Sequence, residues 1–217
     1  MDFGKSFSYV FDDQDWLKKV LIGGVVTLVP ILNFAAIGYA LEVTRRVIKG
    51  TGATPLPEWD DLGGKLVKGL VVVVIAMVYF LPLILLSCVI GIPASFVGDS
   101  EDLAGIVALV SSCFGCLALI YSLFAGMLLP AAIGIYADKD EVGAAFRFGD
   151  VFSLVQKNIG TYLVVLLMSA IVAPIIGSLG AIACGIGAIF TGFYAQLIIG
   201  HLTGQAYNQA SSNIGLI

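Results

Sequence analysis

Four long runs without a charged side chain divide this 217-residue sequence and limit what it can fold into. They cover residues 20–41, 69–98, 103–137 and 158–217, and they contain 22, 30, 35 and 60 residues. A helix that crosses the hydrocarbon core of a membrane needs about 20 apolar residues, each rising about 1.5 Å. The second and third runs therefore predict one crossing each, and the last run predicts two. The first run is long enough for one crossing, but its middle is unusual.

Composition agrees with a membrane protein and excludes two other classes. Hydrophobic residues make up 59% of the chain and charged residues 12%, whereas a soluble domain has about 25% charged residues. A chain of this length cannot bury so much apolar surface away from water. Acidic residues outnumber basic ones by 15 to 11, so no nucleic-acid partner is expected. We expect an all-α integral membrane protein that forms one domain over residues 1–217.

The first charge-free run contains a predicted break at Pro30. Proline removes a backbone donor and disfavours helix at the residue before it, and Asn33 adds a side chain that needs hydrogen bonds. Residues 20–41 therefore form either a kinked spanning helix or a re-entrant pair of half-helices. With a re-entrant segment, all 11 basic residues fall on one side of the membrane and the acidic loop 99–102 on the other. The positive-inside rule favours this arrangement, with four crossings and both termini in the cytoplasm.

Three segments outside these runs have apolar residues at helical spacing and predict interfacial amphipathic helices. They cover residues 2–18, 58–68 and 141–157. Aromatic side chains would anchor them at the depth of the lipid headgroups: Phe7, Phe11, Trp16, Trp59, Phe146 and Phe152. The four crossings are expected over residues 69–94, 103–136, 159–177 and 180–203, and a tight turn near residues 177–180 would join the last two.

Small residues recur at helical spacing in the last run and predict close helix–helix contact. One predicted packing face contains Gly177, Ala181 and Gly185, and the adjacent face contains Gly180, Cys184, Ala188 and Gly192. In lipid, helix association depends on packing and on close backbone approach, which small residues permit. The pattern does not distinguish contacts within the chain from contacts with a partner.

Few polar side chains lie within the apolar runs, and these are the candidate functional positions: Asn33, Gln196, His201 and Gln205. An ionisable residue inside a membrane is by default a functional-site hypothesis. His201 lies near the end of its run, however, where a structural interfacial role is more common than a role as a ligand. Glu42 is predicted to pair with Arg45 and Arg46, three and four residues later. The acidic pairs at 12–13 and 60–61 are predicted to be solvated helix ends.

No arrangement of residues in the sequence predicts catalysis or metal binding. The chain has one histidine, no glycine-rich phosphate loop and no nucleophile beside a base. Cys113 and Cys116 have the spacing of half a metal site, but no His, Asp or Glu lies near them in the sequence. Buried cysteine is usually a small hydrophobic residue. We therefore expect no enzyme activity, no cofactor and no metal.

Short motifs follow one another along the chain in an order that is familiar. They are Phe11-Asp12-Asp13 with Trp16, Leu21-Ile22-Gly23-Gly24, Pro30-Ile31-Leu32-Asn33, Gly38-Tyr39 with Arg45-Arg46, Leu56-Pro57-Glu58-Trp59-Asp60-Asp61, and Gly200-His201-Leu202-Thr203-Gly204-Gln205-Ala206-Tyr207. In this order they resemble a prokaryotic family of multi-pass membrane proteins known as domain of unknown function 4013. The resemblance covers nearly the whole chain, and the stretch 56–61 is its most specific part. It implies a membrane protein without an assigned activity, and no functional residues carry over. We expect the protein in the plasma membrane of a prokaryote.

Two kinds of function fit these observations. The first is a structural or accessory subunit of a larger membrane complex, such as a bioenergetic one, which suits the small-residue faces. The alternative is a small-molecule or ion transporter or channel built on a repeat of broken helices. It is suggested by the break at Pro30 and by a likeness between residues 7–12 and 146–150. A transporter should have more polar groups in the membrane, so we favour the subunit. Its expected partners are the lipid bilayer and other membrane proteins or further copies of the chain.

Overall fold

The computed structural model describes residues 1–50, 56–94, 101–181 and 186–214, and no strand occurs among them. The elements are α1 (Phe3–Ser8), the 3-10 helix η1 (Tyr9–Asp12), α2 (Trp16–Leu28), α3 (Asn33–Lys49), α4 (Leu62–Ala94), α5 (Glu101–Lys139), α6 (Val142–Ala145), α7 (Phe148–Lys157), α8 (Ile159–Ala181) and α9 (Ile186–Ile214). The all-helical fold class is therefore as the composition predicts.

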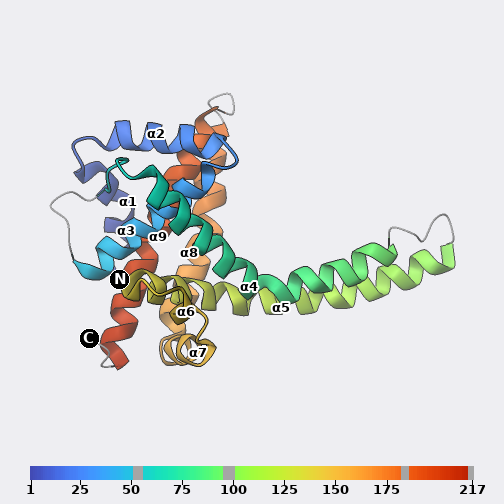
Figure 1. Cartoon of the computed structure of the whole chain (residues 1–217). Coiled ribbons are helices and arrows are strands. Elements are labelled where there is room, and N and C mark those ends of the chain that lie inside the picture. The colour runs from blue at the N-terminus through green and yellow to red at the C-terminus, as the bar shows by residue number, and fades with distance from the viewer. Residues whose placement is uncertain (51–55, 95–100, 182–185, 215–217) are drawn as a thin grey trace.

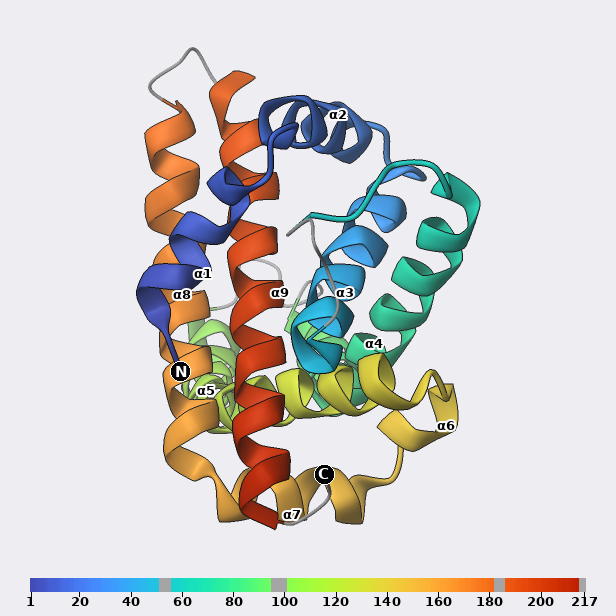
Figure 2. The same cartoon turned by 90° about the vertical axis from the view of Figure 1, so that its left-hand side faces the viewer.

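One helical hairpin, formed by α4 and α5, projects sideways from a body made of the other helices (Figure 1). In the body, α9 packs along both α8 and α3, and α2 lies across its upper end (Figure 2). The inner part of the hairpin belongs to the body, because Ile75 and Tyr79 of α4 and Ala131 of α5 are buried. The outer part extends away from the other helices.

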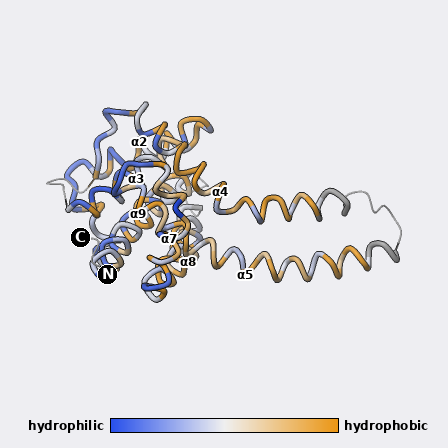
Figure 3. Tube along the Cα trace, turned by 60° about the horizontal axis from the view of Figure 1, so that its bottom comes forward, coloured by the Kyte–Doolittle hydropathy of each residue, from blue (hydrophilic) through white to orange (hydrophobic). Residues whose placement is uncertain are grey.

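Three helices are long and apolar enough to cross a membrane among the described residues, over Leu62–Val89, Gly105–Lys139 and Ile159–Gly180. Hydrophobic residues follow the hairpin far from the body (Figure 3). Many of their side chains are exposed, and Val89 and Leu109 are 68% and 69% accessible. An apolar surface of this size is not left exposed to water, so these helices indicate a membrane protein. A fourth crossing, predicted over residues 180–203, stays a prediction because α9 is not among the three helices.

The predicted break at Pro30 is present. Helix α2 ends at Leu28, and Val29 has the extended backbone (φ −88°, ψ 118°) that a following proline favours. The 13 residues of α2 and the 17 of α3 reach only about 20 Å and 25 Å, too short to cross a hydrocarbon core of about 30 Å. That the pair re-enters the membrane rather than spanning it stays a prediction.

The N-terminal segment differs from the single helix predicted over residues 2–18. It contains α1, η1 and the first turn of α2, with a turn at residues 13–15. The carboxylate of Asp13 accepts a hydrogen bond from the backbone N–H of Asp15 at 2.9 Å. Such a local bond from a side chain to the backbone competes with helix and ends it.

Three other predicted boundaries also differ from the structure. Segments 58–68 and 69–94 are not separate, because α4 runs unbroken from Leu62 to Ala94, whereas segment 141–157 is divided into α6 and α7. Helix α8 continues through the turn predicted near 177–180 and ends at Ala181. Glycine costs a helix only about 1 kcal/mol, too little to end one that packs against a neighbour. The connection to α9 lies outside the described residues.

Glycines set the closest helix contacts in the body. A Cβ atom on Gly38 of α3 would overlap the carbonyl oxygen of Lys65, and one on Gly69 of α4 would overlap that of Phe34. The two backbones therefore touch, as small residues in membrane helices allow. This contact fixes the base of the hairpin against α3.

Candidate functional site

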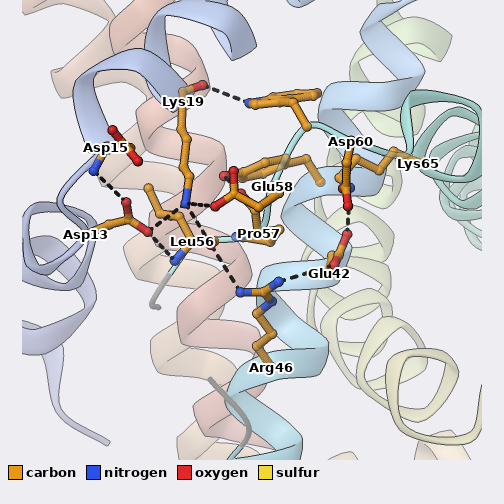
Figure 4. Close-up of polar contacts among 12 residues, drawn as sticks. Asp13, Asp15, Lys19, Glu42, Arg46, Leu56, Pro57, Glu58, Asp60 and Lys65 are labelled. Atoms are coloured by element: carbon orange, nitrogen blue, oxygen red, sulfur yellow. Dashed lines mark hydrogen bonds and ion pairs between the residues drawn. The ribbon is translucent and has the colours of Figure 1, made fainter. Parts of the chain in front are cut away.

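A cluster of charged residues lies where α2, α3 and the segment before α4 meet (Figure 4). At its centre, the ammonium of Lys19 lies 2.9 Å from Asp13 Oδ2 and 2.6 Å from Glu58 Oε1. It also donates to the carbonyl oxygen of Leu56 at 3.3 Å. Lys19 and Asp13 are buried, whereas the Glu58 side chain is 60% exposed. We call these four residues the Lys19 cluster.

Asp13 is the buried anion of this cluster, and the prediction that the acidic pair 12–13 forms a solvated helix end is wrong for it. Its carboxylate also accepts from the backbone N–H of Leu56 at 3.3 Å. Burial alone would raise its pKa, but the hydrogen bonds from Lys19, Asp15 and Leu56 lower it below the ordinary value. Burial would likewise lower the pKa of Lys19, yet its bonds to Glu58 and Asp13 raise it. The pair therefore stays ionised, and Lys19 is not a neutral nucleophile.

A second layer of ion pairs surrounds the cluster on the side of α3. Arg46 donates to the carbonyl oxygen of Leu56 at 3.1 Å. It also lies 3.6 Å from Glu42, which confirms the predicted pairing of these two residues. Lys65 is buried and bridges Glu42 at 3.1 Å and Asp60 at 3.7 Å.

Arg45 does not join the pair predicted with Glu42. Its Nη2 contacts Asp140, and its Nε donates to the carbonyl oxygen of Ala137 at 2.9 Å. Positions 45 and 46, three and four residues after Glu42, point about 100° apart around the helix. Arg45 therefore faces the end of α5 instead. It thereby ties α3 to the root of the hairpin.

Aromatic side chains also bind the segment 56–61 to the body. Tyr39 of α3 donates its hydroxyl to the carbonyl oxygen of Pro57 at 2.7 Å. Its ring stacks on Trp59 with centroids 4.4 Å apart. The indole N–H of Trp59 donates to the carbonyl oxygen of Lys19 at 3.0 Å. Trp59, predicted as an interfacial anchor, thus packs inward against Tyr39 and Phe193. A cleft of about 310 Å³ lies beside it, between Lys18 and Asp60.

His201 and Gln205, two of the predicted polar positions, lie together and bind the N-terminal helix α1. His201 Nδ1 is 3.0 Å from both Ser6 Oγ and Gln205 Nε2, and its ring stacks on Tyr9 with centroids 4.2 Å apart. Gln205 accepts from the backbone N–H of Asp2 at 2.6 Å and donates to the Asp2 carbonyl oxygen at 3.0 Å. Burial, with a contribution from the positive charge of Lys5, lowers the pKa of His201 to about 4. The ring is therefore neutral and has a structural partner.

The other two predicted polar positions lie apart from this contact. The amide oxygens of Asn33 and Gln196 are buried, and neither has a hydrogen-bond partner among the described residues. Gln196 lines a cavity of about 270 Å³ between α3, α4, α5 and α9. A buried polar group without a partner is uncommon and needs an explanation.

The predicted packing faces are described only in part, because Cys184 and Gly185 and the side chain of Ala181 lie outside the described positions. Gly180 does bring α8 close to α9, since a Cβ there would lie 2.6 Å from Ala188 Cα. Gly177 and Gly192 face open space.

Of the remaining predicted anchors, Phe7, Phe11 and Phe152 are exposed, whereas Trp16 and Phe146 are half-buried. Cys113 and Cys116 are exposed free thiols. No group of three metal-ligating side chains occurs among the residues that the structure describes.

Sequence reasoning missed the Lys19 cluster. The available signal was that two of the motifs, 11–13 and 56–61, each contain acidic residues and each precede a charge-free run by fewer than ten residues. Their meeting depends on the turn at residues 29–32 and on the direction of α3, and neither follows from a local pattern.

Comparison with known proteins yields one family. No curated protein and no solved structure is similar to the chain. The model of one family matches residues 22–199, which is most of the sequence and includes Glu42, Arg46 and the stretch 56–61 but not Asp13, Lys19 or His201. The chain therefore belongs to the family described as protein of unknown function DUF4013.

Proposed function

We propose that the protein is a non-catalytic accessory subunit of a larger membrane complex and that it binds its partner through the outer part of the α4–α5 hairpin. The supporting observation is the direction of the apolar helices, because the hairpin extends crosswise to α8 (Figure 1). The hydrocarbon core of a bilayer is about 30 Å thick, and helices that cross it tilt by about 20° on average. The hairpin helices and α8 cannot both lie along the normal of one flat bilayer. The apolar surface of either the hairpin or α8 must therefore be covered by something other than the lipid of that bilayer.

The outer part of α5 is suited to a second helical protein. Residues 105–124 of α5 form about 30 Å of helix, and Leu117, Leu119 and Ile120 are all more than half exposed. Gly115 lies in the middle of this stretch, and a Cβ atom added there would have no heavy atom of the rest of the described chain within 4 Å. A partner helix can approach the backbone closely at such a position.

The mass of the tagged endogenous protein after gentle extraction tests this proposal. We expect larger proteins to be recovered with it in a fixed ratio. Gly115→Leu should release them without unfolding the chain, since the side chain meets open space in the free protein. Gly149→Leu, at an equally open position on α7, is the matched control and should retain them. Recovery of the chain alone, or only with copies of itself, would refute the accessory role.

A plasma-membrane location with both termini in the cytoplasm belongs to the same proposal. It is supported by the positions of the 11 basic residues, none of which lies between residues 69 and 138. Protease protection of tags at each terminus in sealed vesicles tests it. Cleavage of either tag by protease added outside right-side-out vesicles would contradict it.

The second candidate function is a small-molecule or ion transporter. It is favoured by the two buried amide oxygens without partners, those of Asn33 and Gln196. Flux into vesicles separates the candidates: Asn33→Ala and Gln196→Ala should abolish transport by a transporter, whereas in a subunit they should change only stability.

A further inference from the structure

A cavity in the body has the size and lining of a small-molecule site. It is a partly open pocket of about 270 Å³ between α3, α4, α5 and α9. Its apolar wall includes Ile37, Leu41, Val72, Ile133 and Ile199. A dry apolar cavity of about 150 Å³ is enough to admit benzene, so this one accommodates a larger molecule.

The cavity has few polar groups, and they cannot supply the hydrogen bonds that water molecules filling it would need. The single hydroxyl proton of Thr44 is shared between the carbonyl oxygens of Gly200 at 2.9 Å and Ala40 at 3.1 Å, and Thr203 donates to that of Ile199 at 2.8 Å. Both hydroxyls can therefore only accept further bonds. A volume of this size corresponds to roughly nine waters, each needing two to four polar partners. The lining offers too few of them.

Gln196 supplies the specific polar contact. Its side chain lines the cavity, and neither end of its amide makes a hydrogen bond within the described part of the chain. Rotation about its last torsion exchanges the amide oxygen and nitrogen at little cost. A ligand hydroxyl both donates and accepts, so it satisfies the amide in either orientation. No residue lining the cavity is charged, so no side chain there would compensate the charge of a charged ligand.

We propose that this cavity binds a neutral amphiphile that has one hydroxyl group on an apolar body of about ten carbon atoms. The hydroxyl bonds to Gln196, and the apolar body packs against Ile37, Val72 and Ile133. The acyl chain of a phospholipid fits the apolar wall equally well but has no donor at its end. Gln196 therefore distinguishes a free alcohol from a lipid chain.

Photolabelling of the purified full-length protein in detergent tests the proposal. The probe is a ten-carbon alcohol that bears a diazirine, and the comparison probe is the same chain without the hydroxyl. We expect saturable labelling of residues 37–44 and 196–203 by the alcohol, with displacement by excess 1-decanol. Gln196→Leu conserves the volume, and it should weaken that displacement about fivefold, the value of one neutral hydrogen bond, without changing labelling by the alkane.

A pair of variants on one helix separates the cavity from general exposure to apolar probes. Val72→Phe fills the cavity and should abolish labelling, whereas Val74→Phe lies on the exposed face of α4 and should leave it unchanged. An unchanged unfolding temperature shows that each variant is folded. Equal labelling of the two peptides by both probes in the Gln196→Leu protein and its parent would overturn the role of the hydroxyl and leave a lipid chain as the occupant. Labelling confined to the outer hairpin, or unaffected by Val72→Phe, would overturn the site.

Discussion

Acidification should release α1 from α9, because the contact between them depends on a neutral His201. An exposed histidine has a pKa of about 6.5, and burial lowers that of His201 to about 4. The contact is therefore at full strength above pH 6.5 and weakens as the pH falls towards 4. Between pH 7 and pH 5, these two values give a loss of about 2 kcal/mol, or roughly 20-fold in the docking equilibrium.

The hydrogen bonds explain why protonation of His201 weakens this contact. Gln205 Oε1 is held by the backbone N–H of Asp2, so the Gln205 amide presents its N–H group to His201 Nδ1. A proton on Nδ1 faces this N–H donor at 3.0 Å, which leaves the Ser6 hydroxyl oxygen as the acceptor available to it. The charged groups around the ring also oppose each other, because Lys5 disfavours the imidazolium and Asp2 favours it.

Hydrogen exchange of the peptide covering residues 3–12 measures this effect. After correction for the intrinsic rates, its protection should fall about 20-fold from pH 7 to pH 5, while that of α3 stays constant. His201→Asn keeps an acceptor near the Nδ1 position and does not titrate, so its protection should not depend on pH. Equal protection at both pH values in the parent protein, or the same decrease in the Asn variant, would refute the reasoning.

The Lys19 cluster cannot produce a transition in this range. The pKa of Asp13 is below its ordinary value of 3.8, so its contribution to stability is present above that value and is lost as the pH falls through the lowered pKa. The pKa of Lys19 is above its ordinary value of 10.5. Its contribution is present below that value and is lost as the pH rises through the raised pKa. Both contributions are constant between pH 5 and pH 7.

Three further predictions concern the body and are checked by denaturant unfolding of the purified protein. Lys19→Met should lower the free energy of unfolding by about 3 kcal/mol, because it leaves the Asp13 carboxylate buried without its cation, and adding Asp13→Asn should recover most of this loss. Gly38→Ala should prevent α3 and α4 from closing and cost more than about 2 kcal/mol, whereas Gly63→Ala, in open space, should be neutral or stabilising by up to about 1 kcal/mol. Tyr39→Phe should cost about 1 kcal/mol, the value of its lost bond to the segment 56–61.

The sequence predicts what depends on local pattern. Apolar runs locate α4, α5, α8 and most of α9, and Pro30 locates the break between α2 and α3, because chain length, charge and proline geometry act on neighbouring residues. The burial of Asp13 is not predictable in this way. Its partners Lys19 and Leu56 reach it through a turn and a change of helix direction. The contact of Ser6 with His201 joins residues 195 positions apart, and only the packed fold brings them together.

The Lys19 cluster and the hairpin are mechanically connected, although one is charged and the other apolar. The segment 56–61 is held at Leu56 by Lys19 and Arg46 and at Pro57 by Tyr39, and α4 begins directly after it, at Leu62. The glycine contact between α3 and α4 and the bond from Arg45 to the end of α5 then fix the first and last turns of the hairpin. These contacts therefore hold the base of the hairpin in one orientation relative to α3. Weakening those bonds should reorient the hairpin before it disturbs the helices themselves.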